Sequence, residues 1–461
     1  MNTVNIRHSE ALDCDGKAHG AINAAIESVH ASGGGRVTVP AGRWVCGTIV
    51  LRSHVELYLS QGAVLVQSSD RDDFPVLPDA QLPPHIDRDG TGLRRMIVAA
   101  DSEDVAVCGP GVIDADSLDK PPRCSFVLSI MRCRGIRLQD ITIRNAKAWT
   151  CHLCCCDEVA IRGVRMRNPL ETGDGFDIDG CRDVIVSDCD IVTGDDCIVV
   201  KTCRNTRSAE RIAVSNCILR TSCAAFKIGT ETWHDVRAIT VSNCVVHHSG
   251  RAVQIFSMDG ATVEDVVVNG LCIDTNSGII FNRAIHIDCC RRRWGGLLPG
   301  VDCEKLPVGR IRRISISNVS LVTDGRILLT GSDRPLENIS LHNIRMHMPW
   351  IEDPQRLGEI GDKMQSSMDS FDSRQARAAL VASDVAGLDV RAFSVSWPDG
   401  EPPPADLKAK HELGELLIDP HSDEREEPPF HAMRLQRVSG NVETEDLRAS
   451  APGILPVKWM D

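Results

Sequence analysis

The amino-acid sequence predicts an all-β protein, a parallel β-helix, and two observations lead to this prediction. First, a short strand pattern of alternating apolar residues that ends in Asn, Asp or Gly recurs along the middle of the chain. Successive copies lie 23, 25, 28, 27, 27, 48 and 25 residues apart, and such a period with several short strands is typical of this fold. Second, only 4% of the 461 residues are aromatic, so small and β-branched residues must fill the core.

The eight copies of the strand pattern predict eight coils, at residues 135–140, 159–163, 184–188, 212–216, 239–243, 266–270, 314–318 and 339–343. The step of 48 residues predicts one further coil around residues 284–288, together with an insertion. Leucine-rich repeats share the period, but their consensus is absent. Cys189, Cys217 and Cys244 occupy the same register position, so we expect like residues to stack in inward ladders.

The two ends of the chain differ from this pattern. Residues 19–30 carry apolar residues at helical spacing and precede a glycine-rich turn, which predicts a helix that caps the β-helix. We expect one domain of residues 1–461, with 1–60 as the cap and first coils, 61–345 as the central coils with the active site, and 346–461 as irregular C-terminal coils and loops. In the last part we expect strands at 379–381, 390–395 and 431–435, and a loop at 402–404.

Charge and hydropathy exclude several classes of function. The net charge of -13 argues against a general binder of nucleic acid or of anionic membranes, which needs a basic surface. The chain has no apolar run of eighteen residues, and its first residues lack the apolar core of a signal peptide. We therefore expect a cytoplasmic protein, or alternatively a periplasmic or secreted one whose leader has been removed.

The chain has 20 cysteines, and a disulfide framework belongs to short secreted domains rather than to a chain of this length. We interpret most of these cysteines as small buried hydrophobic residues in a reducing compartment. Cys151 and Cys154 have the spacing of half a zinc site, but no second pair follows at finger spacing. We expect no metal and no other cofactor.

Three aspartates carry the functional prediction. Asp174 lies 21 residues before Asp195, which is followed by Asp196, and both sites stand at the head of a strand. If the coils are aligned on their strands, Asp174, Asp195, Ala224 and Arg251 fall at equivalent heights. Because adjacent strands lie about 4.8 Å apart, the three carboxylates would share one cleft, and their repulsion would raise at least one pKa. Carboxylates in one cleft are typical of glycosidic bond cleavage, and sequence spacing leaves open whether the mechanism is inverting or retaining.

The two aspartate motifs resemble those of the polygalacturonase-like glycoside hydrolases of family 28. These motifs are Thr172-Gly-Asp-Gly-Phe-Asp-Ile-Asp179 and Gly194-Asp-Asp-Cys-Ile-Val-Val-Lys201, and the blocks at residues 32–42, 47–54, 62–65 and 109–114 resemble the N-terminal part of that family. The resemblance implies a right-handed parallel β-helix and inverting hydrolysis. It assigns Asp195 as the general acid and Asp174 and Asp196 as the residues that hold the attacking water.

Two further motifs of the family are altered in this chain. The Gly-His-Gly motif falls on Cys223-Ala224-Ala225, and the basic motif falls on residues 251–256, which keep Arg251 and lose the lysine. We expect Lys227 to replace the lost charge on a strip that also holds Asp177 and Gln254, with Lys201 facing the same strip. His152 is expected to orient the substrate and Trp233 to stack on a sugar.

The sequence therefore predicts a glycosidase that acts on a pectin-related oligosaccharide or polysaccharide, as a monomer, with no nucleic-acid or membrane partner. Two alternatives stay open. One is a β-helical uronate lyase or epimerase, which would need a base such as Lys or Tyr, whereas Tyr58 is the only tyrosine. The other is a non-catalytic glycan-binding relative, which the altered motifs would allow.

Overall fold

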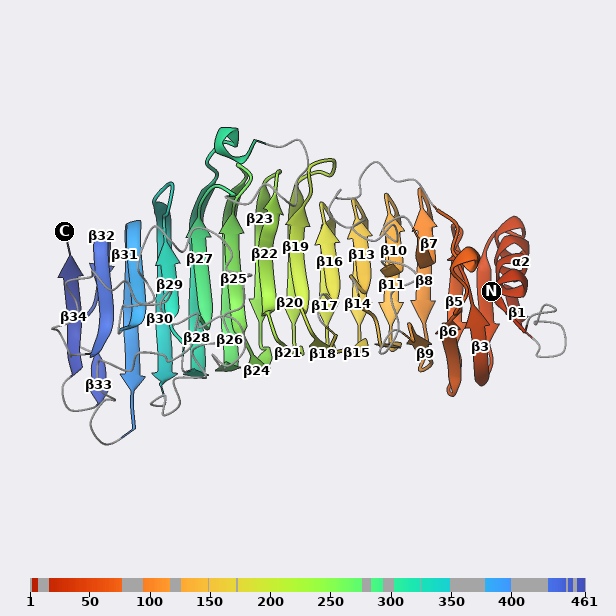
Figure 1. Cartoon of the computed structure of the whole chain (residues 1–461), viewed down its shortest axis with the longest axis horizontal. Coiled ribbons are helices and arrows are strands. Elements are labelled where there is room, and N and C mark those ends of the chain that lie inside the picture. The colour runs from red at the N-terminus through yellow and green to blue at the C-terminus, as the bar shows by residue number, and fades with distance from the viewer. Residues whose placement is uncertain are drawn as a thin grey trace. The chain divides into compact units, whose positions relative to one another are not determined.

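The computed structural model describes residues 2–6, 16–76, 94–116, 126–147, 149–170, 173–275, 283–292, 302–323, 325–348, 378–398, 430–444, 447–450 and 454–460. These residues group into two compact units, one up to Ile218 and one from Leu219 onward. Each unit is a stretch of right-handed parallel β-helix, as predicted (Figure 1). The expected single domain stays a prediction, and the loop expected at residues 402–404 lies outside the described residues.

In the first unit every coil contributes strands to three parallel columns, in which each strand pairs with the equivalent strand of the next coil. The first column contains β1 (Asn2–Asn5), β2 (Gly35–Val39), β5 (Val55–Leu59), β8 (Glu103–Cys108), β11 (Arg134–Gln139), β14 (Asp157–Arg162), β17 (Arg182–Ser187) and β20 (Ala209–Ser215). The second contains β3 (Gly42–Cys46), β6 (Ala63–Gln67), β9 (Val112–Asp114), β12 (Thr142–Arg144), β15 (Arg165–Asn168) and β18 (Asp190–Thr193). The third contains β4 (Ile49–Val50), β7 (Arg95–Ala100), β10 (Phe126–Met131), β13 (Cys151–Cys154), β16 (Phe176–Asp179) and β19 (Ile198–Thr202), and a short 3-10 helix, η1 (Arg71–Asp73), precedes β7.

In the second unit one column contains β22 (Ala224–Thr232), β25 (Arg251–Ser257), β27 (Ile285–Cys289), β29 (Ile327–Thr330), the start of β31 (Ala378–Ser396), β32 (Phe430–Val442) and β34 (Ile454–Met460). The remaining strands are β23 (Val236–Ser242), β24 (Val245–Ser249), β26 (Thr262–Thr275), β28 (Arg310–Thr323), β30 (Leu336–His347) and β33 (Arg448–Ser450). A short 3-10 helix, η4 (Cys303–Lys305), precedes β28, and β21 (Ile218–Thr221) spans the division between the units. The three strands expected in the tail are confirmed, since they lie within β31 and β32.

The Asn, Asp or Gly that ends each repeat has a conformational role. In all eight repeats this residue has a positive φ, between 53° and 70°, which is the left-handed region. Glycine enters this region without strain, and Asn and Asp enter it more readily than other residues. The repeat is therefore a strand followed by a sharp left-handed bend, and it recurs because every coil turns at this point. The eight residues are Asp140, Gly163, Asp188, Asn216, Asn243, Gly270, Asn318 and Asn343.

The prediction of a further coil around residues 284–288 is wrong. β26 pairs directly with β28, with Val266 opposite Ile314, so the step of 48 residues is one long coil. Residues 285–289 form β27, which pairs with β25 and β29 in the other column of the unit. Both kinds of strand alternate apolar residues, so the pattern alone does not tell one column from another.

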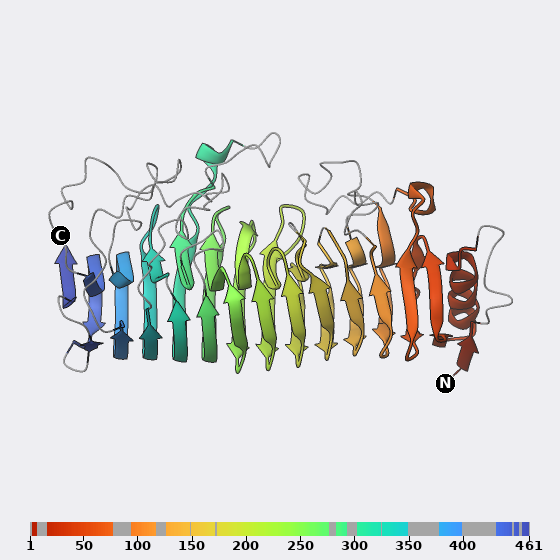
Figure 2. The ribbon, with the colours of Figure 1, turned by 60° about the horizontal axis from the view of Figure 1, so that its bottom comes forward.

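The N-terminal helix is confirmed as α2 (His19–Ala31), which buries Ile22, Ile26 and Val29 and lies beside the first strands (Figure 2). Every cysteine in the described part of the chain is free, and only Cys272 among them is exposed. The Sγ of Cys189, Cys217 and Cys244 each donates to the carbonyl two residues before it, in agreement with the shared register position predicted for them. Within the described residues no helix is long and apolar enough to span a membrane.

Candidate active site

The three predicted aspartates lie at the same ends of neighbouring strands in the first unit. Asp174 precedes β16, and Asp195 and Asp196 precede β19. Phe176 pairs with Ile198, so the same register carries Asp174 level with Asp196 and not with Asp195. The alignment made from sequence spacing is therefore wrong by one residue, because the strands pair with an offset that places the second aspartate of the tandem pair, not the first, level with Asp174.

The backbone connects these two segments closely. The N–H of Gly175 donates to the carbonyl of Asp196 (2.8 Å), and the N–H of Asp195 donates to the carbonyl of Gly173 (3.4 Å). A Cβ added at Gly175 would clash with the carbonyl oxygen of Cys197. Glycine is therefore required between Asp174 and Phe176 for the two strand heads to approach.

The three carboxylates differ in their exposure to solvent. Asp174 is 3% exposed and Asp196 is 1% exposed, whereas Asp195 is half-buried. The Asp195 Oδ1 accepts a hydrogen bond from the backbone N–H of Asp196 (3.0 Å), which holds its side chain in one orientation. The site thus combines one half-buried carboxyl group with two buried ones.

Lys201 contacts the aspartates directly. Its Nζ lies 3.8 Å from Asp174 Oδ2 and 3.4 Å from Asp177 Oδ1. The same Nζ lies over the ring of Trp149, 3.8 Å from the ring centroid, which is within the range of a cation–π interaction. The N–H of Thr150 donates to the carbonyl of Asp174 (3.0 Å), so Trp149 is fixed one coil away from the aspartate.

Burial changes the titration of two of these aspartates. It raises the pKa of Asp174 well above its usual value, and the charges of Asp177, Asp195 and Asp196 raise it further, while Lys201 lowers it. Burial also raises the pKa of Asp177 to about 6, against the lowering effect of Lys201 and of His152. The cluster therefore holds protons at pH values where an exposed aspartate has lost its own.

His152 lies on β13, next to Asp177 in the register, and is fully buried. Its Nε2 lies 3.3 Å from Asp179 Oδ2, and its ring stacks on Phe126 with 5.0 Å between the centroids. Asp179 Oδ1 accepts hydrogen bonds from the Cys203 N–H and the Thr206 hydroxyl. Burial raises the pKa of Asp179, but the hydrogen bond from His152 and the other donors outweigh it and hold the pKa below its usual value.

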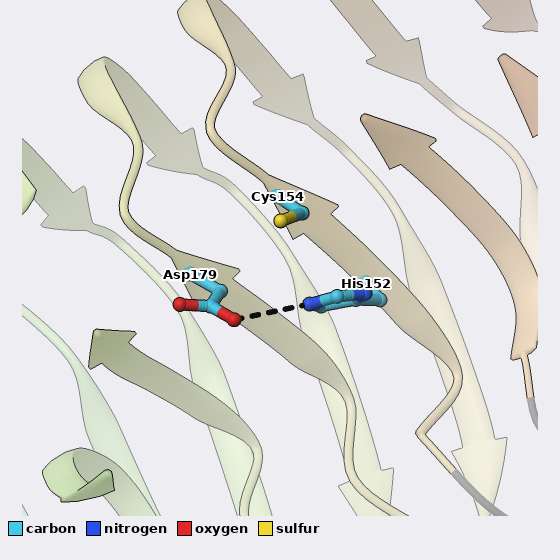
Figure 3. A group of neighbouring side chains, drawn as sticks. All are labelled: His152, Cys154 and Asp179. Atoms are coloured by element: carbon cyan, nitrogen blue, oxygen red, sulfur yellow. Dashed lines mark hydrogen bonds and ion pairs between the residues drawn. The ribbon is translucent and has the colours of Figure 1, made fainter. Parts of the chain in front are cut away.

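Cys154 completes this group, as Figure 3 shows. Its Sγ, a ring nitrogen of His152 and a carboxylate oxygen of Asp179 lie within 4.8 Å of one another, so the three side chains could hold a metal ion. The partners of both Asp179 oxygens already explain why a carboxylate is buried there. The contribution of His152 to substrate binding stays a prediction.

The remaining predicted residues belong to the second unit. Lys227 on β22 pairs with Gln254 on β25, and Arg251 begins β25 opposite Ala224. Lys227, Arg251 and Gln254 are all buried, whereas Trp233 is half-buried in the turn after β22. Their roles in substrate binding stay predictions.

Sequence reasoning missed two interactions of these regions. The first is the stacking of Lys201 on Trp149, for which the alignment of residues 149 and 174 on adjacent coils was the available signal. The second is a buried ion pair in the second unit, in which Arg292 donates to both carboxylate oxygens of Asp259 (2.7 Å each) and to the Thr230 carbonyl. No repeat pattern marked Arg292, because it follows β27 outside the strand.

The described strands thus form a parallel β-helix with a buried group of carboxylates at the heads of two neighbouring strands. Residues 91–273 match the sequence model of glycosyl hydrolases family 28. A probable polygalacturonase of Vitis vinifera is 26% identical over 271 residues, which are 53% of this chain and 54% of that protein. An exopolygalacturonase of Arabidopsis thaliana is 25% identical over 188 residues, 37% of this chain and 44% of that protein. The chain thus spans about half the length of the curated relatives that it matches.

Solved structures share the fold. The family 28 exopolygalacturonase of Yersinia enterocolitica has a TM-score of 0.63 at 16% identity and covers 99% of this chain and 78% of its own. The hyperthermoactive exopolygalacturonase of Thermotoga maritima has a TM-score of 0.59 at 19% identity, over 75% of this chain and 87% of its own. Over residues 91–273 the chain is thus similar to the polygalacturonase-like proteins of glycoside hydrolase family 28, in agreement with the resemblance found in its motifs.

Proposed function

We propose that the protein is a glycosidase that hydrolyses a pectin-related oligosaccharide by inversion. The match to the family 28 model supports a glycoside hydrolase, and relatives named as polygalacturonases support a pectin-related substrate. The observation that carries the proposal is the contrast between the half-buried Asp195 and the buried Asp174 and Asp196 beside Lys201.

In this proposal Asp195 is the general acid, because it is the carboxyl group that a substrate can reach. It donates its proton to the departing glycosidic oxygen as the bond to the anomeric carbon breaks. Asp174 and Asp196 orient a water molecule on the opposite side of the sugar ring and accept its proton as the water oxygen bonds to the anomeric carbon. Inverting hydrolases use this division between an acid and a base.

Lys201 contributes through charge in this scheme. A base must be ionised to accept a proton, and burial and the neighbouring aspartates disfavour ionisation of Asp174. The ammonium group of Lys201, 3.8 Å away, favours the ionised form. We therefore propose that Lys201 is a positioning residue that lowers the pKa of Asp174 and so favours its ionised form, instead of the substrate-binding residue expected from the sequence.

The direct test is to incubate the protein with oligogalacturonides and with rhamnogalacturonan and galactan fragments. The expected result is release of reducing sugar without absorbance in the unsaturated-uronate band, and the first product has the inverted anomeric configuration by proton NMR. Asp195→Asn should lower kcat by roughly 10²–10⁴-fold, the usual contribution of a general acid. Asp188→Asn is the matched control, because Asp188 is a left-handed bend residue on the same unit and should leave kcat unchanged.

The same assay distinguishes the two alternatives. A gain of absorbance in the unsaturated-uronate band would replace the proposal by elimination. Tyr58, the one tyrosine, lies on β5 in the first column and packs under Arg36, whereas the aspartates precede strands of the third column. If no bond is cleaved on the whole panel and Asp195→Asn binds glycans as the wild type does, the protein is a glycan-binding relative.

A further inference from the structure

Gln254 and His286 lie side by side on adjacent strands of the second unit. Gln254 on β25 pairs with His286 on β27, and Lys227 on β22 pairs with Gln254 on the other side. In a parallel column, paired residues point to the same face of the sheet about 4.8 Å apart. Their neighbours Val253 and Ile255 point the other way, into the core. Figure 1 shows β22, β25 and β27 as successive strands.

Both side chains are buried without a visible reason for their polarity. Gln254 is 0% exposed and His286 is 1% exposed. Among the residues that the structure describes, the Nε2 and Oε1 of Gln254 and both ring nitrogens of His286 have no hydrogen-bond partner. An unsatisfied buried polar group is costly, and native proteins leave few of them. A ligand that supplies hydrogen-bonding groups to these two adjacent side chains would satisfy all four atoms.

His286 is held in its neutral form. Burial lowers its pKa well below the usual value, and the charges of Arg283 and Arg251 lower it further. The ring is also fixed in place, because it meets the edge of Phe256 at 4.8 Å between centroids and an angle of 88°. A neutral imidazole presents one donor and one acceptor, and so does the amide of glutamine, with an N–H₂ and a carbonyl oxygen.

This set of donors and acceptors selects among ligand groups. A hydroxyl group both donates and accepts, so two adjacent hydroxyl groups can satisfy all four atoms. A carboxylate only accepts, and it would leave the Gln254 carbonyl and the unprotonated ring nitrogen facing a negative charge. A hydroxyl pair therefore fits this pair of side chains better than a carboxylate does.

We propose that Gln254 and His286 form a sugar subsite that recognises two adjacent hydroxyl groups of one pyranose ring, with no requirement for a carboxylate. The identification of the ligand as a sugar rests on the proposed function, whereas the hydroxyl specificity rests on these two residues. The subsite would let this chain bind neutral as well as acidic sugars. It also gives a role to two residues for which no core packing accounts.

The test is calorimetric titration of the full chain with methyl galactoside and methyl galacturonate, each together with its 2-deoxy, 3-deoxy and 4-deoxy analogues. The expected result is similar affinity for the two parent glycosides. Loss of either hydroxyl of one adjacent pair should weaken binding roughly ten- to a hundred-fold, because a buried partner is left unsatisfied, and loss of the third should have no effect.

Substitutions of Gln254 and His286 test whether these two residues bind the sugar. Gln254→Leu and His286→Leu should each weaken binding of both parent glycosides at least roughly ten-fold. His286→Asn keeps a donor and an acceptor and should bind more tightly than His286→Leu. His342→Asn is the matched control, since His342 of the same unit already pairs with Asp389, and it should bind as the wild type does. Thermal unfolding by circular dichroism verifies that each variant is folded.

Three results would overturn the proposal. The first is unchanged sugar binding in folded Gln254→Leu and His286→Leu. The second is at least ten-fold preference for the galacturonate with no effect of deoxygenation, which would mean that Lys227 grips a carboxylate. The third is a crystal structure grown with methyl galactoside in which only water contacts the four atoms. Hydrolysis that persists in both leucine variants with unchanged KM removes the subsite and leaves the proposed function intact. If sugar binding depends on Gln254 and His286 but no hydrolysis is found, the subsite is supported and the proposed function is wrong.

Discussion

The ammonium group of Lys201 is surrounded by groups that interact favourably with a positive charge. On its strand column it faces Asp174, Asp177 and the ring of Trp149, and Asp195 and Asp196 complete the charged groups around Asp174. An ammonium held in this way has little freedom to follow a substrate. The same residue would be assigned to substrate binding from sequence alone, because strand alternation gives the face on which it lies but not its partners.

Replacing Lys201 by Met should shift the pH dependence of kcat upward on its acidic limb. The reason is that Lys201 lowers the pKa of Asp174 and of Asp177, so its removal raises both, and the base is ionised only at higher pH. KM should change less than kcat. The measurement is kcat and kcat/KM against pH on the best substrate of the oligosaccharide panel. Lys201→Arg, which keeps the charge, should lie close to the wild type. An unchanged pH profile with a raised KM would show that Lys201 binds substrate.

We expect Trp149 to affect the pH dependence of kcat through its contact with Lys201. Trp149→Leu removes the aromatic face on which the ammonium group lies, and such contacts contribute roughly 0.5–2 kcal/mol. We expect a smaller upward shift of the acidic limb than for Lys201→Met, and no additional shift in the double variant. Additive shifts in the double variant would contradict a shared pathway. The acidic limb of kcat against pH is the readout.

The strand patterns allowed one strand in each of eight coils, the N-terminal helix and three strands of the tail to be predicted from the sequence. Each left-handed bend needs Gly, Asn or Asp, so the chemistry of one residue marks the end of a strand in every coil. The pattern does not show to which column a strand belongs. For this reason β27 is predicted as part of an extra coil. The pattern also misses offsets of one residue between paired strands, which is why Asp174 was aligned with Asp195 instead of Asp196.

The bend residues permit a matched stability experiment in the second unit. Asn243 has a φ of 53°, a conformation that costs an alanine roughly 1–2 kcal/mol. Asn243→Ala should therefore lower the free energy of unfolding by about that amount, whereas Asn243→Gly should change it little, because glycine enters this region freely. Chemical denaturation with both variants is the measurement. Equal losses for Ala and Gly would show that the side chain of Asn243, not its backbone conformation, matters.

Gly175 offers a prediction that links an element to the site. A methyl group there would clash with the carbonyl oxygen of Cys197, and β16 and β19 would have to separate at the head where Asp174 and Asp196 lie. Gly175→Ala should cost roughly 1–3 kcal/mol of stability, as overpacking usually does, and should lower kcat more than it raises KM. Full activity in this variant would mean that the spacing of the two strand heads is unimportant for the chemistry.

The pH dependence of stability reflects the buried aspartates at the scale of the whole molecule. An aspartate in the unfolded chain titrates near 3.9, whereas the folded pKa of Asp177 is about 6 and that of Asp174 is also raised. Between about pH 4 and pH 6 these two carboxyl groups therefore bind more protons in the folded protein than in the unfolded one. Their contribution to the free energy of unfolding should then increase as the pH falls through this window, whereas His286, whose pKa is lowered by burial, contributes with the opposite sign. Asp179, whose pKa is lowered, acts oppositely and costs stability only below about pH 4.

Asp177→Asn separates this contribution from the rest of the molecule. One pKa unit corresponds to about 1.4 kcal/mol, so the variant should lose roughly 1–3 kcal/mol of the stability that the wild type gains between pH 6 and pH 4. Guanidinium unfolding at pH 7, 6, 5 and 4.5 measures this difference, and Asp188→Asn, at a bend of the same unit, should keep the wild-type dependence. If Asp177→Asn instead shows the same dependence on pH as the wild type between pH 7 and pH 4.5, then Asp177 does not take up a proton in this range, contrary to its raised pKa.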